Sequence, residues 1–428
     1  MKELRLNNIS IAKDGQRIEY DYGYSKNLSH FFNAKNFFYV EYDQEINKVP
    51  ESLLVIPFLS NIMPMSWFVG FDVYIKECDH TFYNSLETLK AQFLEFFPEN
   101  NLGGTLYVEK LIDNHIEGTN TSLLFSGGLD SYDSLIRNLD KKPYLISIHG
   151  ADVQINDTTR WEKFVKFNGE ENILDHSRLF YVKSNLREFY TYRVNLLTDL
   201  GWWGGIQHGM ALLGVLAPIS YRYGITDIRI AASATHEVSY SWGSSPKIDE
   251  NMKWANTHVT HDGYDQRRTD KIDNVVDFVN KTGEQMKLRV CYADERIGYN
   301  CSKCHKCQRT ILSLILSNAD PKDYGFEIPA NFYKLIFENF HENAVMTVGI
   351  KYQWTCLQDK AKSISQFFVH ENEENEKSQI KRFAALNLDD TVNKNADNVK
   401  KQGRLRLTLR EKFPILYKIY QRIKPKNN

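Results

Sequence analysis

Residues 122–131 read SLLFSGGLDS, and no other segment of the chain says more about its architecture. The apolar run SLLF at its start is typical of a parallel strand that is buried on both faces. Gly127 and Gly128 then permit a tight turn with positive φ and a close approach of the backbone to a ligand. We expect the residues after the turn, SYDSLIRNL, to form a helix.

Alternating strands and helices continue downstream of this segment. Further strands are predicted at residues 143–150 (PYLISIHG), 178–184 (RLFYVKS), 227–233 (DIRIAAS) and 286–292 (MKLRVCY). Helices are predicted at residues 159–167, 186–198 and 205–223. This alternation implies a parallel sheet with right-handed crossovers. The fold class predicted for residues 119–320 is therefore α/β with a doubly wound parallel sheet.

The chain extends well beyond this segment on both sides. Residues 1–118 are rich in short Tyr, Phe, Val and Ile runs, which predict a β-rich α+β domain of unknown role with one helix near residues 86–97. Residues 52–71 carry no charge and have the length of a membrane-spanning helix. Two prolines would interrupt that helix, so we interpret the stretch as two buried strands joined by a loop. Residues 321–428 are predicted to form a helical extension.

Composition excludes several classes of protein. The 428 residues include 53 Lys+Arg and 54 Asp+Glu, a near balance that argues against a nucleic-acid partner. Six cysteines are too few for a disulfide scaffold, and the N-terminus lacks the apolar segment of a secretory signal, so we expect a cytoplasmic protein. The basic tail, residues 400–428, is interpreted as a solvated helix. The alternative is an amphipathic segment lying on an anionic membrane or on RNA.

The glycine turn has the features of an anion site. Backbone N–H groups of the turn and of the first helical turn carry the positive end of the helix dipole. Ser126 and Ser131 add hydroxyl donors, so the turn suits an anion of the size of pyrophosphate. Asp130 would repel a phosphate unless a cation lay between them, which predicts Mg²⁺. The segment lacks the lysine of the GK[ST] loop and the spacing of GxGxxG.

The six residues SGGLDS resemble the SGGxDS signature of the PP-loop ATP pyrophosphatases. The resemblance implies an adenine nucleotide alpha hydrolase-like fold, in which ATP is split between its α and β phosphates and AMP passes to a substrate. It implies that the backbone at His149 and Gly150, where the next strand ends, lies near the adenine. It also implies that ATP contacts the signature itself: Ser126, Gly127, Gly128, Leu129, Asp130 and Ser131.

Four of the six cysteines are spaced C-x9-C-x2-C-x2-C. Four thiolates in this arrangement can surround Zn²⁺ as a tetrahedron and leave no open position, which predicts a structural metal site. An iron–sulfur cluster is the less favoured alternative. Lys303, Lys306 and Arg309 would offset the negative charge of the thiolates, and His305 is either an extra ligand or a surface residue. The predicted ligands are Cys291, Cys301, Cys304 and Cys307.

SGGLDS followed by this cysteine spacing resembles the 7-cyano-7-deazaguanine synthase branch of the PP-loop family, over about residues 122–318. The resemblance implies that a carboxylate is adenylated and that ammonia converts it to an amide and then a nitrile. The chain departs from that branch in its N-terminal domain, its C-terminal extension and the loop at residues 233–254. The muramoyl-peptide glutamate epimerases, the sugar amidotransferases of surface polysaccharides and phage-defence relatives supply alternative chemistries.

Several polar residues near predicted strand and helix ends are further candidates. Arg268 is a candidate clamp for pyrophosphate, and Lys271 a candidate for neutralising charge at the α-phosphate. Ser233 and His236 follow a strand, where open α/β sheets bind ligands, and His236 or His261 is a candidate base. For each of these residues, a purely structural role is the alternative.

The glycine-rich segments of residues 201–209 and 239–265 are predicted to be loops shaped for a ligand. His208, at the start of the helix that follows the first of them, is a candidate nucleotide contact, with a structural role as the alternative.

The sequence therefore predicts an enzyme that uses ATP, Mg²⁺ and Zn²⁺ to adenylate a small-molecule or peptide carboxylate. A non-catalytic ATP sensor that binds through the same loop is one alternative, although Asp130 and both serines favour catalysis. A nucleic-acid-modifying PP-loop enzyme is another, and the near-neutral charge argues against it.

Overall fold

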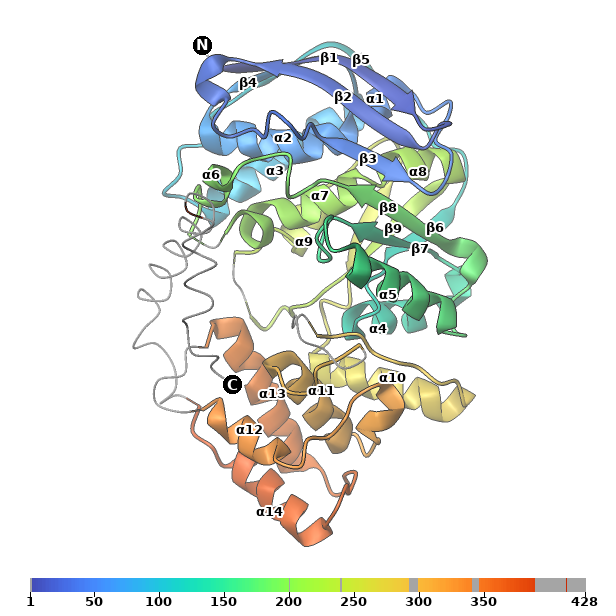
Figure 1. Ribbon diagram of the computed structural model, residues 1–428, viewed down its shortest axis with the longest axis vertical. Helices are drawn as coiled ribbons and strands as arrows, with labels where there is room; N and C mark the ends of the chain where they lie inside the picture. The colour runs from blue at the N-terminus through green and yellow to red at the C-terminus, as the bar shows by residue number, and fades with distance from the viewer. Residues whose placement is uncertain are drawn as a thin grey trace.

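The computed structural model describes residues 2–199, 201–238, 241–291, 299–340, 346–388 and 413. The ten strands within these ranges form one sheet, in the order β10-β9-β6-β7-β8-β3-β2-β1-β4-β5 (Figure 1). The strands are β1 (Glu3–Ala12), β2 (Arg17–Tyr24), β3 (Tyr39–Tyr42), β4 (Asp72–Asp79), β5 (Leu106–Ile112), β6 (Asn120–Leu124), β7 (Tyr144–His149), β8 (Leu179–Ser184), β9 (Ile225–Ala231) and β10 (His258–Asp262).

Helices cover this sheet and continue beyond it toward the C-terminus, so the chain is α/β with a mostly parallel sheet, as its strand–helix alternation predicts. A π-helical turn, η4 (Trp203–Gln207), leads directly into α7. The α-helices are α1 (Glu51–Leu54), α2 (Ile56–Val69), α3 (His80–Phe96), α4 (Leu129–Arg137), α5 (Thr158–Glu170), α6 (Tyr192–Asn195), α7 (His208–Gly214), α8 (Ala217–Tyr223), α9 (Pro246–Asp249), α10 (Arg268–Thr282), α11 (His305–Leu316), α12 (Phe332–Glu338), α13 (Val348–Ser363) and α14 (Glu373–Ala384).

The five strands from β6 to β10 are parallel to one another and determine where a ligand can bind. From β6 the chain passes through α4 to β7 and β8 on one side, and later returns through α7 and α8 to β9 and β10 on the other. The connections from the neighbouring strands β6 and β9 thus lead in opposite directions. Ligands of open parallel sheets bind at the carboxyl ends of such a pair, and the SGGLDS loop directly follows β6.

Each face of the parallel strands is covered by its own hydrophobic core. Leu123 of β6 and Leu145 of β7 belong to the core that includes α4, α10 and α11. Ile146 and Ile148 of β7 belong to the core that includes α2, α7 and α8. Side chains of a strand alternate between faces, so a strand that is covered on both sides reads as a continuous apolar run.

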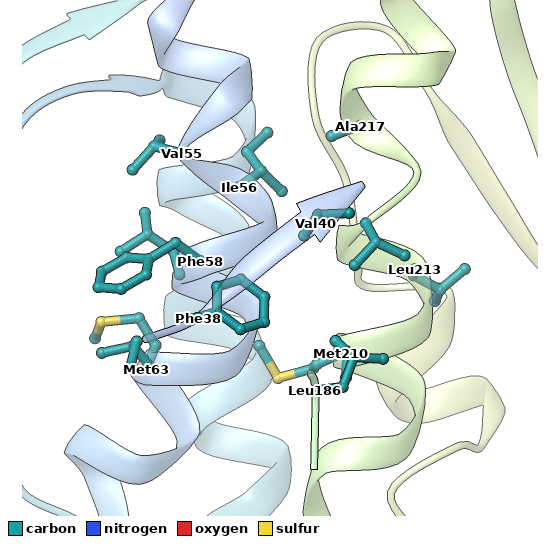
Figure 2. Close-up of a cluster of buried hydrophobic side chains, with 14 of the residues drawn as sticks. Phe38, Val40, Val55, Ile56, Phe58, Met63, Leu186, Met210, Leu213 and Ala217 are labelled. Atoms are coloured by element: carbon teal, nitrogen blue, oxygen red, sulfur yellow. The ribbon is translucent and has the colours of Figure 1, made fainter. Parts of the chain in front are cut away.

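The N-terminal strands extend the same sheet. β3 pairs antiparallel with β8, with Val40 opposite Ser184, and β2, β1, β4 and β5 follow outward. Figure 2 shows Phe38 and Phe58 from the N-terminal part packed near Met210 of α7. The N-terminal part and the parallel strands therefore share one hydrogen-bonded sheet and one core.

The prediction of two buried strands within residues 52–71 is wrong, because these residues form α1 and α2. Pro57 lies in the first turn of α2, where a backbone N–H has no helical partner. Pro64 lies inside the helix and removes one donor, but α2 is buried along most of its length, and that packing outweighs the lost bond. Within the described residues, no helix is long and apolar enough to cross a membrane.

Four other predictions of local structure are corrected. Residues 258–262, taken as part of a polar loop, form strand β10. Residues 286–291, predicted as a strand, pair with no described strand. The helix predicted over residues 186–198 is limited to the single turn of α6, and the loop predicted over residues 201–209 contains η4 and the start of α7.

Among the described residues after 320, the chain is mostly helical. Helices α12, α13 and α14 lie beside α10 and α11, away from the N-terminal strands (Figure 1). Trp354 of α13 is fully buried in the core that also holds Leu123 and Leu145. The basic tail at residues 400–428 lies outside the described residues, apart from the single position 413.

Candidate nucleotide site and metal centre

The loop after β6 turns sharply before α4 begins. Gly127 has a φ of 68°, a conformation that a side chain would strain. Gly128 is the N-cap of α4 and has no side chain that could cap the helix. The backbone N–H groups of the first turn are therefore available to an anion, aided by the helix dipole.

Two serine hydroxyls flank this turn. The Oγ atoms of Ser126 and Ser131 lie 3.3 Å apart, and Ser131 Oγ also donates to the carbonyl oxygen of Gly128 at 3.0 Å. Since Ser131 lies on the first turn of α4 and Ser126 lies two residues after the end of β6, the sequence spacing brings both hydroxyls to the same turn.

Arg289 holds the turn through its carbonyl oxygens. Its backbone N–H donates to Gly127 O at 2.7 Å, and its guanidinium donates to Ser126 O at 2.8 and 3.2 Å. These bonds engage oxygens whose partial negative charge would otherwise repel an anion. The sequence analysis missed Arg289, because a lone arginine 163 residues from its partner carries no local pattern.

Asp130 is surrounded by cations. Arg268 Nη1 lies 2.7 Å from its Oδ2, and Lys271 Nζ lies 3.7 Å from its Oδ1. Burial alone would raise the pKa of Asp130, but Arg268, Lys271 and Lys306 outweigh burial and hold that pKa below its usual value. Both cations predicted to contact phosphate therefore lie next to the turn.

A cleft of about 630 Å³, including its open mouth, adjoins the start of α4. It is lined by the loop after β9 and by residues of α10, α11 and α13. Arg268, Lys306 and Arg309 line it, and the described lining includes no carboxylate. Burial, together with Arg268, lowers the pKa of Lys306 to about 8 and that of Arg309 to about 10. Clustered and partly buried cations of this kind favour an anionic ligand.

Some of the predicted site residues lie around the turn and the cleft, and others do not. The signature residues, Arg268, Lys271 and Ser233 lie around the turn and the cleft. His236 is exposed in the loop after β9, where its backbone N–H bonds Tyr264 O at 3.0 Å, and it does not line the cleft. Tyr352 and Cys356 of α13 line the cleft, and the sequence analysis did not assign them to it.

His149 and Gly150 lie at the end of β7, and packing contacts account for both residue types there. The His149 ring stacks on Trp161 at 4.7 Å, and its Nε2 lies 3.1 Å from Gln154 O. A Cβ at Gly150 would lie 1.7 Å from Ser184 O, so the approach of β8 alone requires glycine there. Both residues are buried, and any contact with a nucleotide would come from the backbone at this strand end.

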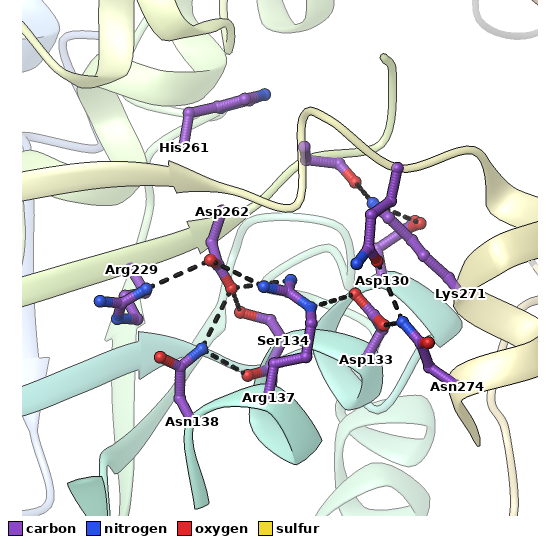
Figure 3. Close-up of polar contacts among 12 residues, drawn as sticks. Asp130, Asp133, Ser134, Arg137, Asn138, Arg229, His261, Asp262, Lys271 and Asn274 are labelled. Carbon is purple, nitrogen blue, oxygen red and sulfur yellow. Dashed lines mark hydrogen bonds and ion pairs between the residues drawn. The ribbon is translucent and has the colours of Figure 1, made fainter. Parts of the chain in front are cut away.

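His261 and Asp262 of β10 project to opposite sides of the sheet (Figure 3). A second polar group surrounds His261, on the side away from Asp262. His261 Nδ1 lies 2.7 Å from Asp249 Oδ2, and both side chains are buried. Ser244 donates to the same oxygen at 2.7 Å. Asp249 Oδ1 and His208 Nδ1 are buried without a hydrogen-bond partner among the described residues. Asp249 thus orients the His261 ring through its Nδ1.

Asp262 joins β10 to α4 through a buried ion cluster (Figure 3). Arg137 binds its two oxygens at 3.1 and 2.9 Å, Arg229 binds Oδ1 at 3.2 Å, and Ser134 donates to Oδ2. Burial would raise the pKa of Asp262, but Arg137, Ser134 and Arg229 lower it overall. The carboxylate therefore stabilises the folded state in its ionised form.

We expect Asp262→Ala to lower the free energy of unfolding by about 1–3 kcal/mol, because Arg137 and Arg229 lose a buried partner and keep only Asp133 and Asp227. The wild-type stabilisation is present above the ordinary pKa of aspartate and is lost as the pH falls below about 4. Urea unfolding at pH 7 and pH 3 measures both effects, and Asp227→Ala, in a more exposed ion pair, is the matched control. Equal losses for the two variants at pH 7 would contradict the prediction.

The four cysteines are gathered as the sequence predicts, with their Sγ atoms all within 4.8 Å of one another. The Sγ distances are 3.8 Å for Cys291–Cys304, 3.9 Å for Cys301–Cys307 and 3.6 Å for Cys304–Cys307. Zn–S bonds of about 2.3 Å place the sulfurs of a tetrahedron about 3.8 Å apart. The cluster therefore has the dimensions of a four-cysteine zinc site, and His305 is not part of it.

Comparisons with protein-family models, with curated proteins and with solved structures find no match for this chain.

Proposed function

We propose that this chain is an ATP pyrophosphatase of the PP-loop kind that transfers AMP to a carboxylate. The proposal is carried by one observation, the position of the SGGLDS turn at the carboxyl ends of β6 and β9, beside a cleft lined by Arg268, Lys306 and Arg309. Backbone N–H groups and several cations at one point suit a polyphosphate. The resemblance of SGGLDS to the PP-loop signature supplies the choice of ATP and of cleavage after the α-phosphate.

In the proposed first step, a carboxylate oxygen attacks the α-phosphorus of ATP. The new bond gives an acyl-adenylate, and the bond to the β-phosphate breaks with release of pyrophosphate. The carboxylate has no proton to lose, so this step needs positioning and charge neutralisation rather than a base. Arg268 and Lys271, both beside Asp130, supply that neutralisation.

Asp130 is the proposed ligand of Mg²⁺, which would offset phosphate charge there. Its Oδ1 is buried without a hydrogen-bond partner among the described residues and faces Lys271 Nζ at 3.7 Å, so under the proposal the metal ion would bind this oxygen beside that ammonium group. Its Oδ2 is bonded to Arg268. Under the proposal, Arg268 transfers from this carboxylate to a phosphate when the nucleotide enters.

For the second step we propose attack of ammonia or an amine on the acyl carbon, which releases AMP and forms an amide. In the branch that the chain resembles, the amide oxygen would attack a second ATP, and its departure with AMP, together with loss of two N–H protons, would leave a nitrile. The buried His261–Asp249 pair favours one alternative, epimerisation next to the activated carbonyl. His261 Nε2 would remove the C–H proton there, as a base oriented by a carboxylate does.

The test is to incubate the full chain with ATP, Mg²⁺ and a panel of carboxylates, and to measure AMP and pyrophosphate. The panel includes the deazaguanine carboxylic acid, muramoyl peptides and uronic-acid sugars. Hydroxylamine, a strong nucleophile, would trap an acyl-adenylate as a hydroxamate. Equal amounts of AMP and pyrophosphate that depend on one acid would support the proposal. Binding of ATP without AMP formation for any acid would favour the sensor.

A further inference from the structure

A second concave surface lies between α13 and α14, which pack against each other in the C-terminal part of the chain (Figure 1). Its volume is about 830 Å³, including its open mouth. It is lined by residues within 361–367 and 377–385, and it shares no lining residue with the cleft beside the glycine turn. This surface is called the α13–α14 groove below.

The floor of the groove is apolar. Ala361, near the end of α13, and Ile364 and Phe367, in the segment that follows it, are partly buried against the core that includes α4, α10 and α11. Ile380 of α14 is buried in the same core, and Ala384 lies one helical turn further along the groove. An apolar side chain placed in the groove would therefore extend an existing core.

The rim of the groove is cationic. Lys362 of α13 and Lys377 and Lys381 of α14 line it, whereas the described lining holds no Asp or Glu. Lys362 pairs with Asp359 at 3.4 Å on the surface. Lys377 and Lys381 are exposed and form no ion pair with any described residue. Because they are four residues apart on one helix, their charges repel each other, and an anionic occupant would relieve that repulsion.

We propose that the α13–α14 groove binds an acidic amphipathic helix of a partner protein. Lys377 and Lys381 are separated by one helical turn, about 6 Å, which is also the spacing of two carboxylates at positions i and i+4 of a partner helix. Apolar side chains on the same face of that helix would fill the floor, as in other proteins that bind a helix in a hydrophobic groove.

Charge and shape argue against two other occupants. Residues 400–428 of this chain contain ten Lys and Arg against one acidic residue, so the tail carries the same sign of charge as the rim of the groove. A flat anionic membrane would contact the rim lysines but would leave the concave apolar floor unfilled. A helix with acidic and apolar side chains on one face matches both the rim and the floor.

Helix α13 lines both the groove and the cleft. Tyr352 and Cys356 line the cleft, and Ala361 and Lys362 line the groove. The six residues from Cys356 to Lys362 correspond to about 9 Å of helix. A partner in the groove would therefore contact the same helix that forms one wall of the cleft.

The first experiment measures binding of a fluorescein-labelled peptide to the full chain by fluorescence anisotropy. The peptide is a helix of about 18 residues with Leu at positions i, i+3, i+4 and i+7 and Glu beside them. One control peptide carries Lys in place of each Glu, and the other has the same composition without the helical spacing. The acidic helix should bind about 10-fold more tightly than either control. Equal affinities for the three peptides would overturn the proposal.

The second experiment repeats the measurement with variants of the groove. A Lys377→Glu, Lys381→Glu double variant should bind the acidic helix about 10-fold more weakly, because two attractions become repulsions. Ala385→Trp, at an exposed position of the lining, should weaken binding by obstructing the groove without changing its charge. Lys334→Glu is the matched control, since Lys334 is exposed on α12 and does not line the groove. Wild-type affinity in either groove variant, with thermal unfolding unchanged, would overturn the site.

Two further measurements test the other occupants. Flotation of the full chain with phosphatidylserine vesicles should show no binding that depends on Lys377 and Lys381, and sedimentation should show no dimer that depends on them. Vesicle binding, or a dimer, that the double variant abolishes would assign the groove to a membrane or to a second copy and would overturn the partner helix. None of these readouts involves AMP formation, so they are independent of the proposed function.

Discussion

Asp130→Ala is expected to reduce the rate of AMP formation by about 10²–10³-fold, the usual cost of removing one preorganised charged group beside developing phosphate charge. The variant removes the carboxylate that orients Arg268 and Lys271, and with it the proposed Mg²⁺ ligand. The measurement is release of AMP and pyrophosphate at saturating ATP.

Asp265→Ala is the matched control, because Asp265 is exposed and lies in the loop before α10. Its rate should equal that of the wild type. An Asp130→Ala variant that stays within a few-fold of the control would contradict the assigned role of this carboxylate. Thermal unfolding of both variants separates a loss of chemistry from a loss of fold.

Cys307→Ser is expected to lose the bound metal and, with it, cooperative folding of the segment from residue 286 to residue 388. A structural zinc contributes apparent binding energies of about 10–16 kcal/mol in small zinc domains, which is as large as the whole stability of a typical protein. Cys307 is fully buried at the start of α11, so loss of its bond to the metal loosens that helix.

Metal analysis and thermal unfolding measure both effects. Cys78→Ala is the control, since it removes a fully buried thiol far in sequence from the cluster and should keep one metal per chain. A Cys307→Ser protein that retains one equivalent of metal would contradict the ligand assignment. A colourless wild type with zinc in equal amount excludes the iron–sulfur alternative, because such clusters absorb visible light.

The turn and the cysteine cluster could be predicted from the sequence because the residues that form each of them lie close together in the chain. The strand, the two glycines and the helix that form the turn lie within residues 120–137, and the four cysteines lie within residues 291–307. Short spacing determines which side chains meet, whatever the rest of the chain does. The mostly parallel sheet was also predictable, from apolar runs separated by helices.

Arg289 at the turn could not be predicted, and the sequence indicates Arg309 only as a cation beside the cysteines and not as part of the cleft, because only the fold brings these two residues to others far away in the chain. Residues 286–291 show a related difficulty. Met286, Leu288 and Val290 are buried in alternation, which is the pattern of a strand. The segment instead runs beside the phosphate turn, where Arg289 N–H bonds Gly127 O and Leu288 N–H bonds Tyr324 O. Extended backbone and a strand give the same burial pattern.

Strand β10 was missed for the opposite reason. His258, His261 and Asp262 make it polar, and sequence rules read polar residues as loop. Two of these side chains are buried because they have charged partners: His261 pairs with Asp249, and Asp262 pairs with Arg137 and Arg229. A polar strand of this kind becomes recognisable only when its partners are known.

The pairing of β3 with β8 also determines when the sheet can form during synthesis of the chain. β3 ends at Tyr42 and β8 begins at Leu179, so about 140 further residues must leave the ribosome before the ladder can close. At ordinary elongation rates this takes roughly 7–30 s, during which α2 and the edge of β3 lack their cover. Chaperone dependence of newly made chains should therefore centre on the first 118 residues, and a fragment that starts at residue 119 would expose the bare edge of β8.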